Sequence, residues 1–205
     1  LKDNAQVSII TIQSEEGLEI MRHTLTAQVL ARAIKTLYPK SKLAIGPTIE
    51  DGFYYDVESE EVISSDDLIK IEDEMKNIIK TKSLLTKKLV SKSEALKIFK
   101  EKKEPFKETI INESNQKNDF QLYYQDNEEF VDLCRGPHLP SLGFIGSFKL
   151  TKVSGAYWKG DSKNTMLTRI YGTAFNSDKD LQKHLNEVEE AVSYTHLRAH
   201  ETPIN

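Results

Sequence analysis

The amino-acid sequence predicts an α+β fold with a mainly antiparallel sheet and flanking helices. Three observations support this prediction. Apolar residues recur at steps of three and four in the first half of the chain, short aromatic and β-branched runs separated by turn residues follow residue 120, and no regular alternation of strand and helix occurs. Helices and strands that are segregated along the chain are typical of α+β folds.

Apolar periodicity locates the helices. Residues 18–37 carry an apolar stripe and are followed by Pro39, so one amphipathic helix is expected to end there. A serine followed three residues later by an acidic residue is typical of a helix start. Such pairs predict two more helices, at Ser64 with Asp67 and at Ser91 with Glu94, and a last helix is predicted from Ser177.

Extended segments are expected between turn residues. Residues 42–57 are predicted to form two short extended pieces in a hairpin-like loop, because Gly46-Pro47 and Asp51-Gly52 are turn sequences. The later part of the chain supplies the other strands, which are predicted over 120–124, 129–133, 148–153 and 166–171.

Length and charge exclude several classes of protein. A chain of 205 residues holds one domain or one domain with part of another, and no apolar run approaches the roughly 20 residues of a membrane span. The chain lacks a signal-peptide pattern and its single Cys cannot form an internal disulfide, so a cytoplasmic protein is expected. A net charge of −4 argues against non-specific coating of nucleic acid, but the lysines between residues 80 and 103 allow a focused basic patch.

The segment Phe130–Pro140 carries the strongest chemical signal. Three residues separate Cys134 from His138, and a tight turn there can direct both side chains to one point. This arrangement suits a metal ligand pair, a nucleophile with its base, or a polar pocket that orients water, although a lone Cys is also common as a small buried apolar residue. His23, in the first helix, becomes relevant only if it meets these two residues in space.

Five blocks along the chain occur in a fixed order: RHTLTAQVLARAIKTLYP, IGPTIEDGFYYDV, EPFKE, FVDLCRGPH and GAYWKGDSKNTMLTRIYGTAF. In this combination they resemble the threonyl-tRNA synthetases of the bacterial type, specifically their N-terminal editing region, over about residues 7–191. The resemblance implies the α+β editing domain that threonyl- and alanyl-tRNA synthetases share. It also implies an activity, the hydrolysis of serine wrongly attached to threonine tRNA.

The resemblance divides the chain into the end of a TGS domain at 1–13, the editing domain at 14–176, a linker helix toward the aminoacylation core at 177–191 and a non-native tail at 192–205. The first part contains a strand-like stretch, Val7–Ile12. The tail breaks the helical pattern and resembles translated sequencing adaptor, so its His196 and His200 are expected to have no function. The aminoacylation core, with its ATP, magnesium and zinc, is expected to be missing.

A second sieve for serine has a physical reason. Serine is threonine without one methyl group, and one methylene changes discrimination in a pocket by only about 1–3 kcal/mol. The shared hydroxyl offers nothing for a polar contact to reject. A pocket too tight for the threonine methyl group but open to serine can remove the wrong amino acid and spare the right one.

The resemblance assigns site residues in two groups: His23, Lys107, Cys134 and His138 are the catalytic candidates, and Tyr55, Asp132, Gln28 and Arg135 are the substrate-binding candidates. His23 and Lys107 would position the ribose hydroxyl and the attacking water. Cys134 and His138 would shape the pocket. Asp132 would orient or capture the serine amine.

The first helix departs from the family pattern, which is often His-x-x-x-His. Here Gln28 occupies the second place with one residue extra after His23, and an extra residue rotates a helix by about 100°. Either the helix starts after His23, or the site geometry differs, or Thr24 takes the first place. Only His23, Cys134 and His138 would remain as zinc ligands, which with a water would describe a catalytic zinc. The resemblance to threonyl editing sites implies instead a water-based site without tightly held metal.

The expected partners are the tRNA acceptor end carrying serine and the rest of the synthetase chain, with no membrane, and the longer protein is expected to be a homodimer. Lysines between residues 80 and 103 and aromatic residues near Tyr55 are candidates for contact with the acceptor end. Two alternatives stay open: a freestanding trans-editing factor and a non-catalytic tRNA-binding module. A deacylation assay separates the module from an enzyme.

Overall fold

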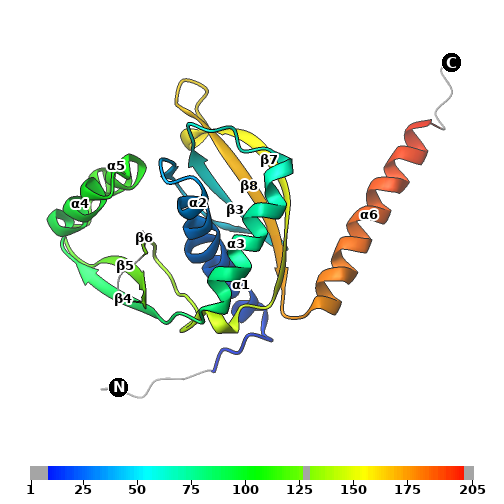
Figure 1. Ribbon diagram of the computed structural model, residues 1–205, viewed down its shortest axis with the longest axis horizontal. Helices are drawn as coiled ribbons and strands as arrows, with labels where there is room; N and C mark the ends of the chain where they lie inside the picture. The colour runs from blue at the N-terminus through cyan, green and yellow to red at the C-terminus, as the bar shows by residue number, and fades with distance from the viewer. Residues whose placement is uncertain (1–8, 127–129, 201–205) are drawn as a thin grey trace.

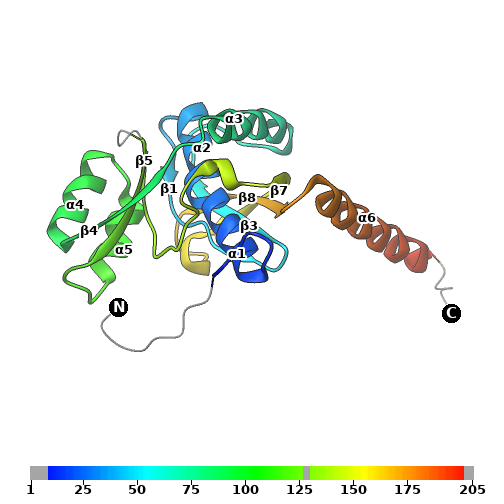
Figure 2. The same cartoon turned by 90° about the horizontal axis from the view of Figure 1, so that it is seen from below.

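The computed structural model describes residues 9–126 and 130–200, the last nine of them by backbone alone. It has two antiparallel sheets with helices packed against them, so the predicted α+β class is confirmed (Figure 1). The larger sheet and its helices form the main body of the molecule. The smaller sheet, with α4 and α5, lies beside it, and α6 extends away on the opposite side (Figure 2).

The predicted helix at residues 18–37 is one continuous helical run in three parts. It consists of α1 (Glu15–Thr24), a π-helical stretch η1 (Leu25–Leu30) and α2 (Ala31–Leu37). The Ser14 side chain caps the start by accepting a hydrogen bond from the Gly17 amide. The run begins well before His23, so the interpretation that the helix starts after this residue was wrong.

The larger sheet is built from β1 (Lys42–Leu43), β2 (Thr48–Ile49), β3 (Gly52–Glu58), β7 (Ser147–Tyr157) and β8 (Met166–Phe175). Its strand order is β1-β3-β8-β7, with β2 paired to β3 as the predicted hairpin. The helical run and α3 (Leu68–Lys80) cover one face and share a core with it, and α3 begins at the predicted Ser64–Asp67 capping box through the short helix η2 (Ser65–Asp67). Buried Phe53 and Ile170 belong to this core.

The smaller sheet has the order β4-β5-β6, with β4 (Leu85–Val90), β5 (Phe120–Gln125) and β6 (Val131–Leu133). α4 (Lys92–Glu101), capped by Ser91 as predicted, and α5 (Pro105–Glu113) accompany this sheet. Apolar side chains of α4, α5 and the sheet form a second core. Neither β4 nor α5 was predicted from the sequence. The interior of β4 is mostly exposed and rich in Lys, and α5 is short, with Pro105 at its first position as the one clear signal.

The remaining helices are η4 (Leu142–Phe144), η5 (Trp158–Gly160) and α6 (Asp178–His200). Ser177 caps α6 as predicted, since its hydroxyl accepts a hydrogen bond from the Asp180 amide. The α6 backbone stays helical to His200, beyond the residue where the sequence pattern breaks. No described helix is both long enough and apolar enough to cross a membrane.

The predicted strand Val7–Ile12 is not seen in its described part, because residues 9–12 have no strand structure, and Val7 and Ser8 lie outside the described residues. Residues 201–205 of the predicted tail also lie outside them. The division of the chain at residues 13, 176 and 191 stays a prediction.

Candidate functional site

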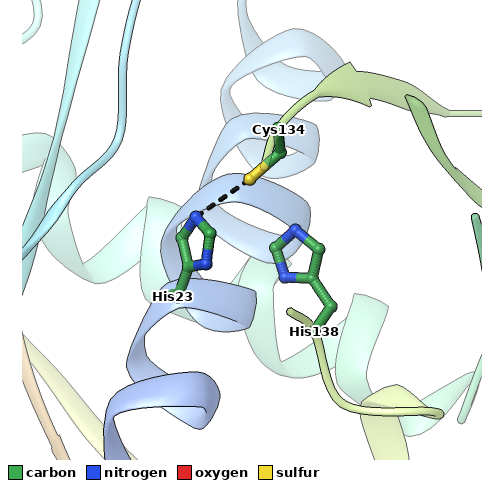
Figure 3. Close-up of side chains that lie close together, drawn as sticks. All are labelled: His23, Cys134 and His138. Carbon is green, nitrogen blue, oxygen red and sulfur yellow. Dashed lines mark hydrogen bonds between the residues drawn. The ribbon is translucent and has the colours of Figure 1, made fainter. Parts of the chain in front are cut away.

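Three chemically active side chains from distant parts of the sequence meet at one point. His23 lies in the last turn of α1, Cys134 directly follows β6, and His138 lies in the loop beyond it. Figure 3 shows the two imidazole rings side by side, with the Cys134 sulfur next to them. The ring centroids are 4.6 Å apart, and one donor atom from each of the three residues lies within 4.8 Å of the others. His23 therefore does meet Cys134 and His138 in space.

The loop after β6 turns sharply to bring Cys134 and His138 to the same place. Gly136 has φ +64° and is followed by a cis peptide bond to Pro137. A Cβ atom at Gly136 would clash with the Tyr123 hydroxyl, so both the conformation and the space require glycine. The Gly136 amide also donates to the Cys134 sulfur at 3.5 Å.

His23 and Cys134 form a neutral hydrogen-bonded pair. Burial lowers the pKa of His23 and raises the pKa of Cys134 to about 11, so the imidazole is neutral and the thiol is protonated near pH 7. The His23 Nδ1 atom lies 3.3 Å from the Pro137 carbonyl oxygen, which can only accept, so Nδ1 carries the proton. Nε2 then accepts from the Cys134 thiol at 2.9 Å. A protonated thiol is a poor nucleophile, which favours the water-based interpretation over a cysteine nucleophile.

His138 is held as a neutral ring with one free nitrogen. Thr24 Oγ1 donates to the Ile20 carbonyl and accepts from the Leu139 amide, so its contact of 3.1 Å with His138 Nδ1 requires the proton to lie on Nδ1. Burial and the neighbouring His23 lower the pKa of His138 to about 3. Its Nε2 atom is therefore unprotonated, and it is buried without a hydrogen-bond partner.

A buried ion pair lies next to these residues. Lys107 in the first turn of α5 places its Nζ 2.6 Å from Asp132 Oδ1, and the two side chains are 4% and 2% exposed. The Tyr55 hydroxyl accepts from Lys107 at 3.2 Å and donates to Asp132 Oδ2 at 3.2 Å. Burial raises the pKa of Tyr55 well above its usual value, so the phenol stays protonated. The ammonium group of Lys107 keeps one N–H for a further acceptor.

A pocket of about 800 Å³ is lined by His23 and Cys134 and by the ion pair of Lys107 and Asp132. We call it the site pocket. Its walls include His23, Ala27, Lys107, Gln121, Asp132, Cys134 and Arg135. They come from the helical run, from α5, from β5 and from β6 and the loop after it, so the pocket lies between the helical run and the smaller sheet with α5. A smaller pocket, which shares His23 with the site pocket, is lined by Glu16 and Glu19.

Two residues predicted to bind substrate lie elsewhere. Tyr55 is fully buried and does not line the site pocket, because its hydroxyl is used to hold Lys107 and Asp132. Gln28 is also fully buried, and its side-chain oxygen accepts from Gln125. Asp132 does line the pocket, but its oxygen atoms already bind Lys107, Tyr55 and the Leu133 amide rather than being free for an amine.

The π-helical stretch explains where Gln28 goes. It absorbs the extra residue between α1 and α2, so both flanking helices keep their packing. Ala27, four residues after His23, lines the pocket at the place that the family pattern gives to a second histidine. The stretch also lets two adjacent residues serve the site, since His23 binds Cys134 and Thr24 binds His138.

Tyr123 also belongs to the site, although the sequence did not predict it there. Its ring meets the His138 ring edge-on, with centroids 4.4 Å apart. The cross-strand register pairs it with Asp132. The period-2 pattern of the predicted strand at 120–124 was the available signal, but the register with β6 was not predictable from it.

The donor atoms of His23, Cys134 and His138 are of the types that zinc binds. Tetrahedral zinc holds its nitrogen and sulfur ligands about 3.6 Å apart. The 2.9 Å separation of His23 Nε2 and Cys134 Sγ is shorter than this, so these two atoms would have to separate to admit the ion.

Known proteins with similar sequences are threonine--tRNA ligases. Residues 121–171 match the family model described as the threonyl and alanyl tRNA synthetase second additional domain. The chain is 51% identical over 97% of its length to threonine--tRNA ligase 2 of Bacillus subtilis (strain 168), and 47% identical over 97% to threonine--tRNA ligase of Prochlorococcus marinus (strain MIT 9515). It is 46% identical over 95% of its length to threonine--tRNA ligase of Hahella chejuensis (strain KCTC 2396).

The chain spans only 30–31% of the length of these relatives. The matched span covers 95–97% of this chain. The chain therefore corresponds to a segment of the threonyl-tRNA synthetase family, the segment that contains the editing domain shared with alanyl-tRNA synthetases.

Proposed function

We propose that this segment hydrolyses the ester bond between serine and threonine tRNA. The observation that carries the proposal is that His23, Lys107 and Cys134 line the same pocket, between the helical run and the smaller sheet with α5. These side chains supply a neutral imidazole, an ammonium donor and a protonated thiol. Such a set suits the activation of water and the stabilisation of an oxyanion without a covalent intermediate.

In the proposed reaction, a water oxygen forms a bond to the ester carbonyl carbon, and the bond from this carbon to the ribose oxygen breaks. A proton from the water ends on the leaving ribose oxygen. When the water binds, the Cys134 thiol gives up its bond to His23 Nε2, and this nitrogen then orients the water and the ribose hydroxyl. The free N–H of Lys107 faces the charge that develops on the carbonyl oxygen. Asp132 and Tyr55 keep the ammonium group in place.

The pocket would discriminate by size rather than by polarity. Serine and threonine share their hydroxyl group, so only the methyl group of threonine can be refused. The wall formed by His23 and Cys134, which are hydrogen-bonded at 2.9 Å, would exclude this methyl group. We therefore expect the threonyl ester to be spared although it carries every polar group of the seryl ester.

The deciding experiment is deacylation of threonine tRNA charged with serine or with threonine. We expect the chain to release serine and to leave the threonyl ester close to its uncatalysed rate of hydrolysis. Release of neither amino acid, with tRNA still bound, would support the non-catalytic module instead. The observation that favours this module is the withdrawal of Gln28 from the pocket, which leaves apolar Ala27 in its place.

We propose that the reaction needs no metal, because His23 and Cys134 are already paired at 2.9 Å. Zinc bound by His23, Cys134 and His138 would supply an activated water if the pair opened. Elemental analysis of the purified chain should find far less than one zinc per molecule, and a chelator should leave the rate of serine release unchanged. Stoichiometric zinc, lost together with activity, would contradict this.

In the longer protein, we propose that this segment proofreads for an aminoacylation core that attaches threonine to tRNA using ATP. The relatives named above are threonine--tRNA ligases about three times as long as this chain. A cytoplasmic homodimer remains the expected form. A freestanding trans-editing factor would need only the segment described here.

A further inference from the structure

Positive charge is concentrated in one unit of the fold. Residues 80–103 contain nine lysines and two glutamates, whereas the whole chain has a net charge of −4. This stretch includes β4 and α4. None of its lysines lines the site pocket, so the proposed hydrolysis does not account for them. A local excess of this size favours an anionic partner.

The register of the smaller sheet separates these lysines by face. Lys87 pairs with Tyr123, which pairs with Asp132, so Lys87 lies in the cross-strand row that leads to the site. Cross-strand partners share a face of the sheet. Lys88 pairs instead with Leu122, which is fully buried in the second core on the other face. The two adjacent lysines therefore point to opposite sides.

Leu89 extends the same face beyond the pocket. It pairs with Gln121, which lines the site pocket, and it is 56% exposed although it is a large apolar side chain. β4 is the outer strand of its sheet, so Lys87 and Leu89 form an exposed cation and an exposed apolar surface at the rim of the site pocket. We call these two residues the β4 rim.

Negative charge disfavours one approach to the site pocket. The second pocket, which shares His23 with it, is lined by Glu16 and Glu19, whose charge disfavours a phosphate backbone there. Single-stranded RNA is bound where a cation contacts the backbone and an apolar surface contacts a base. The β4 rim offers both features directly beside the pocket.

Building on the hydrolysis proposed above, we propose that the single-stranded 3′ end of the tRNA crosses the β4 rim to enter the site pocket. Lys87 contacts a phosphate of this strand, and Leu89 supports a base or ribose. The partner is therefore the unpaired acceptor end, and the paired stem makes no contact with Lys87. Lys88, on the opposite face, takes no part.

The test uses the full chain and an RNA hairpin that ends in single-stranded CCA, with the same hairpin lacking the overhang as a second probe. A single phosphate contact to a single strand has a salt slope of about −0.7, which corresponds to roughly four-fold in affinity at 0.15 M salt. Lys87→Ala should raise the dissociation constant for the CCA hairpin by about this factor and reduce the salt slope by about 0.7. Lys88→Ala is the matched control and should change neither quantity, and Leu89→Ser should weaken binding of the CCA hairpin only.

Equal weakening by Lys87→Ala and Lys88→Ala would overturn the proposal, because it would show a diffuse charge effect without a preferred face. An equal loss for both hairpins would also overturn it. The outcome is separable from the hydrolysis proposed above. If the unmodified chain hydrolyses neither ester but Lys87→Ala still weakens binding of the CCA hairpin alone, the hydrolysis proposal fails and the β4 rim stands.

Discussion

Replacement of His23 by Ala is expected to lower the rate constant for release of serine from mischarged tRNA by about 10²- to 10⁴-fold, the range typical of a lost acid-base group. His23 lines the site pocket, binds the Cys134 thiol and stacks on His138, so its removal takes away the group that orients water. Single-turnover deacylation with seryl-tRNA measures the effect.

Two further variants sharpen this result. His23→Gln keeps a hydrogen-bonding side chain but cannot take up a proton, so it should remain as slow as His23→Ala. His184→Ala removes a histidine of α6 that contacts Phe175 and should behave as the unmodified chain. Rapid serine release by His23→Ala would rule out the role assigned to the imidazole.

Replacement of Lys107 by Met is expected to destabilise the fold by about 3–5 kcal/mol and to abolish serine release. The cost arises because Asp132, 2% exposed, would be left as a buried charge with only neutral hydrogen-bond donors. Denaturant unfolding followed by circular dichroism measures the free energy of unfolding, and the deacylation assay measures the activity.

The double variant Lys107→Met/Asp132→Asn separates the two effects. The amide that replaces the carboxylate would carry no charge and could still accept from Tyr55, so most of the lost stability should return. Serine release should not return, since the ammonium donor is still missing. A double variant that regains activity would show that Lys107 contributes to folding alone.

Local signals in the sequence predicted much of the fold. The cap residues Ser64 and Ser91 begin helices because their side chains satisfy backbone amides at the first turn, which is a property of a few neighbouring residues. Strand β4 was missed for the opposite reason. Its exposed Lys and Thr residues show no apolar alternation, and only pairing with β5 holds it as a strand.

The residues that meet at the candidate site were predictable from the sequence, but the positions of Gln28 and Tyr55 were not. The convergence of His23, Cys134 and His138 followed from the family motifs, and the structure brings them together. The displacement of Gln28 and the burial of Tyr55 depend on helix geometry and on a buried hydrogen-bond network, which no short motif encodes. An accurate prediction would have needed the long-range packing of η1 against the sheets.

The π-helical stretch at Leu25–Leu30 accommodates one extra residue between α1 and α2. Loss of a single residue from it would remove the π-helical turn and leave α1 and α2 as one regular α-helix, with both flanks in their present packing. The residue that the stretch presents to the site pocket would then change, while His23 and the hydrophobic core behind α2 kept their places. Insertions and deletions at this one point can therefore exchange the side chains offered to a ligand without rebuilding the scaffold, whereas length changes elsewhere in the run would disturb both.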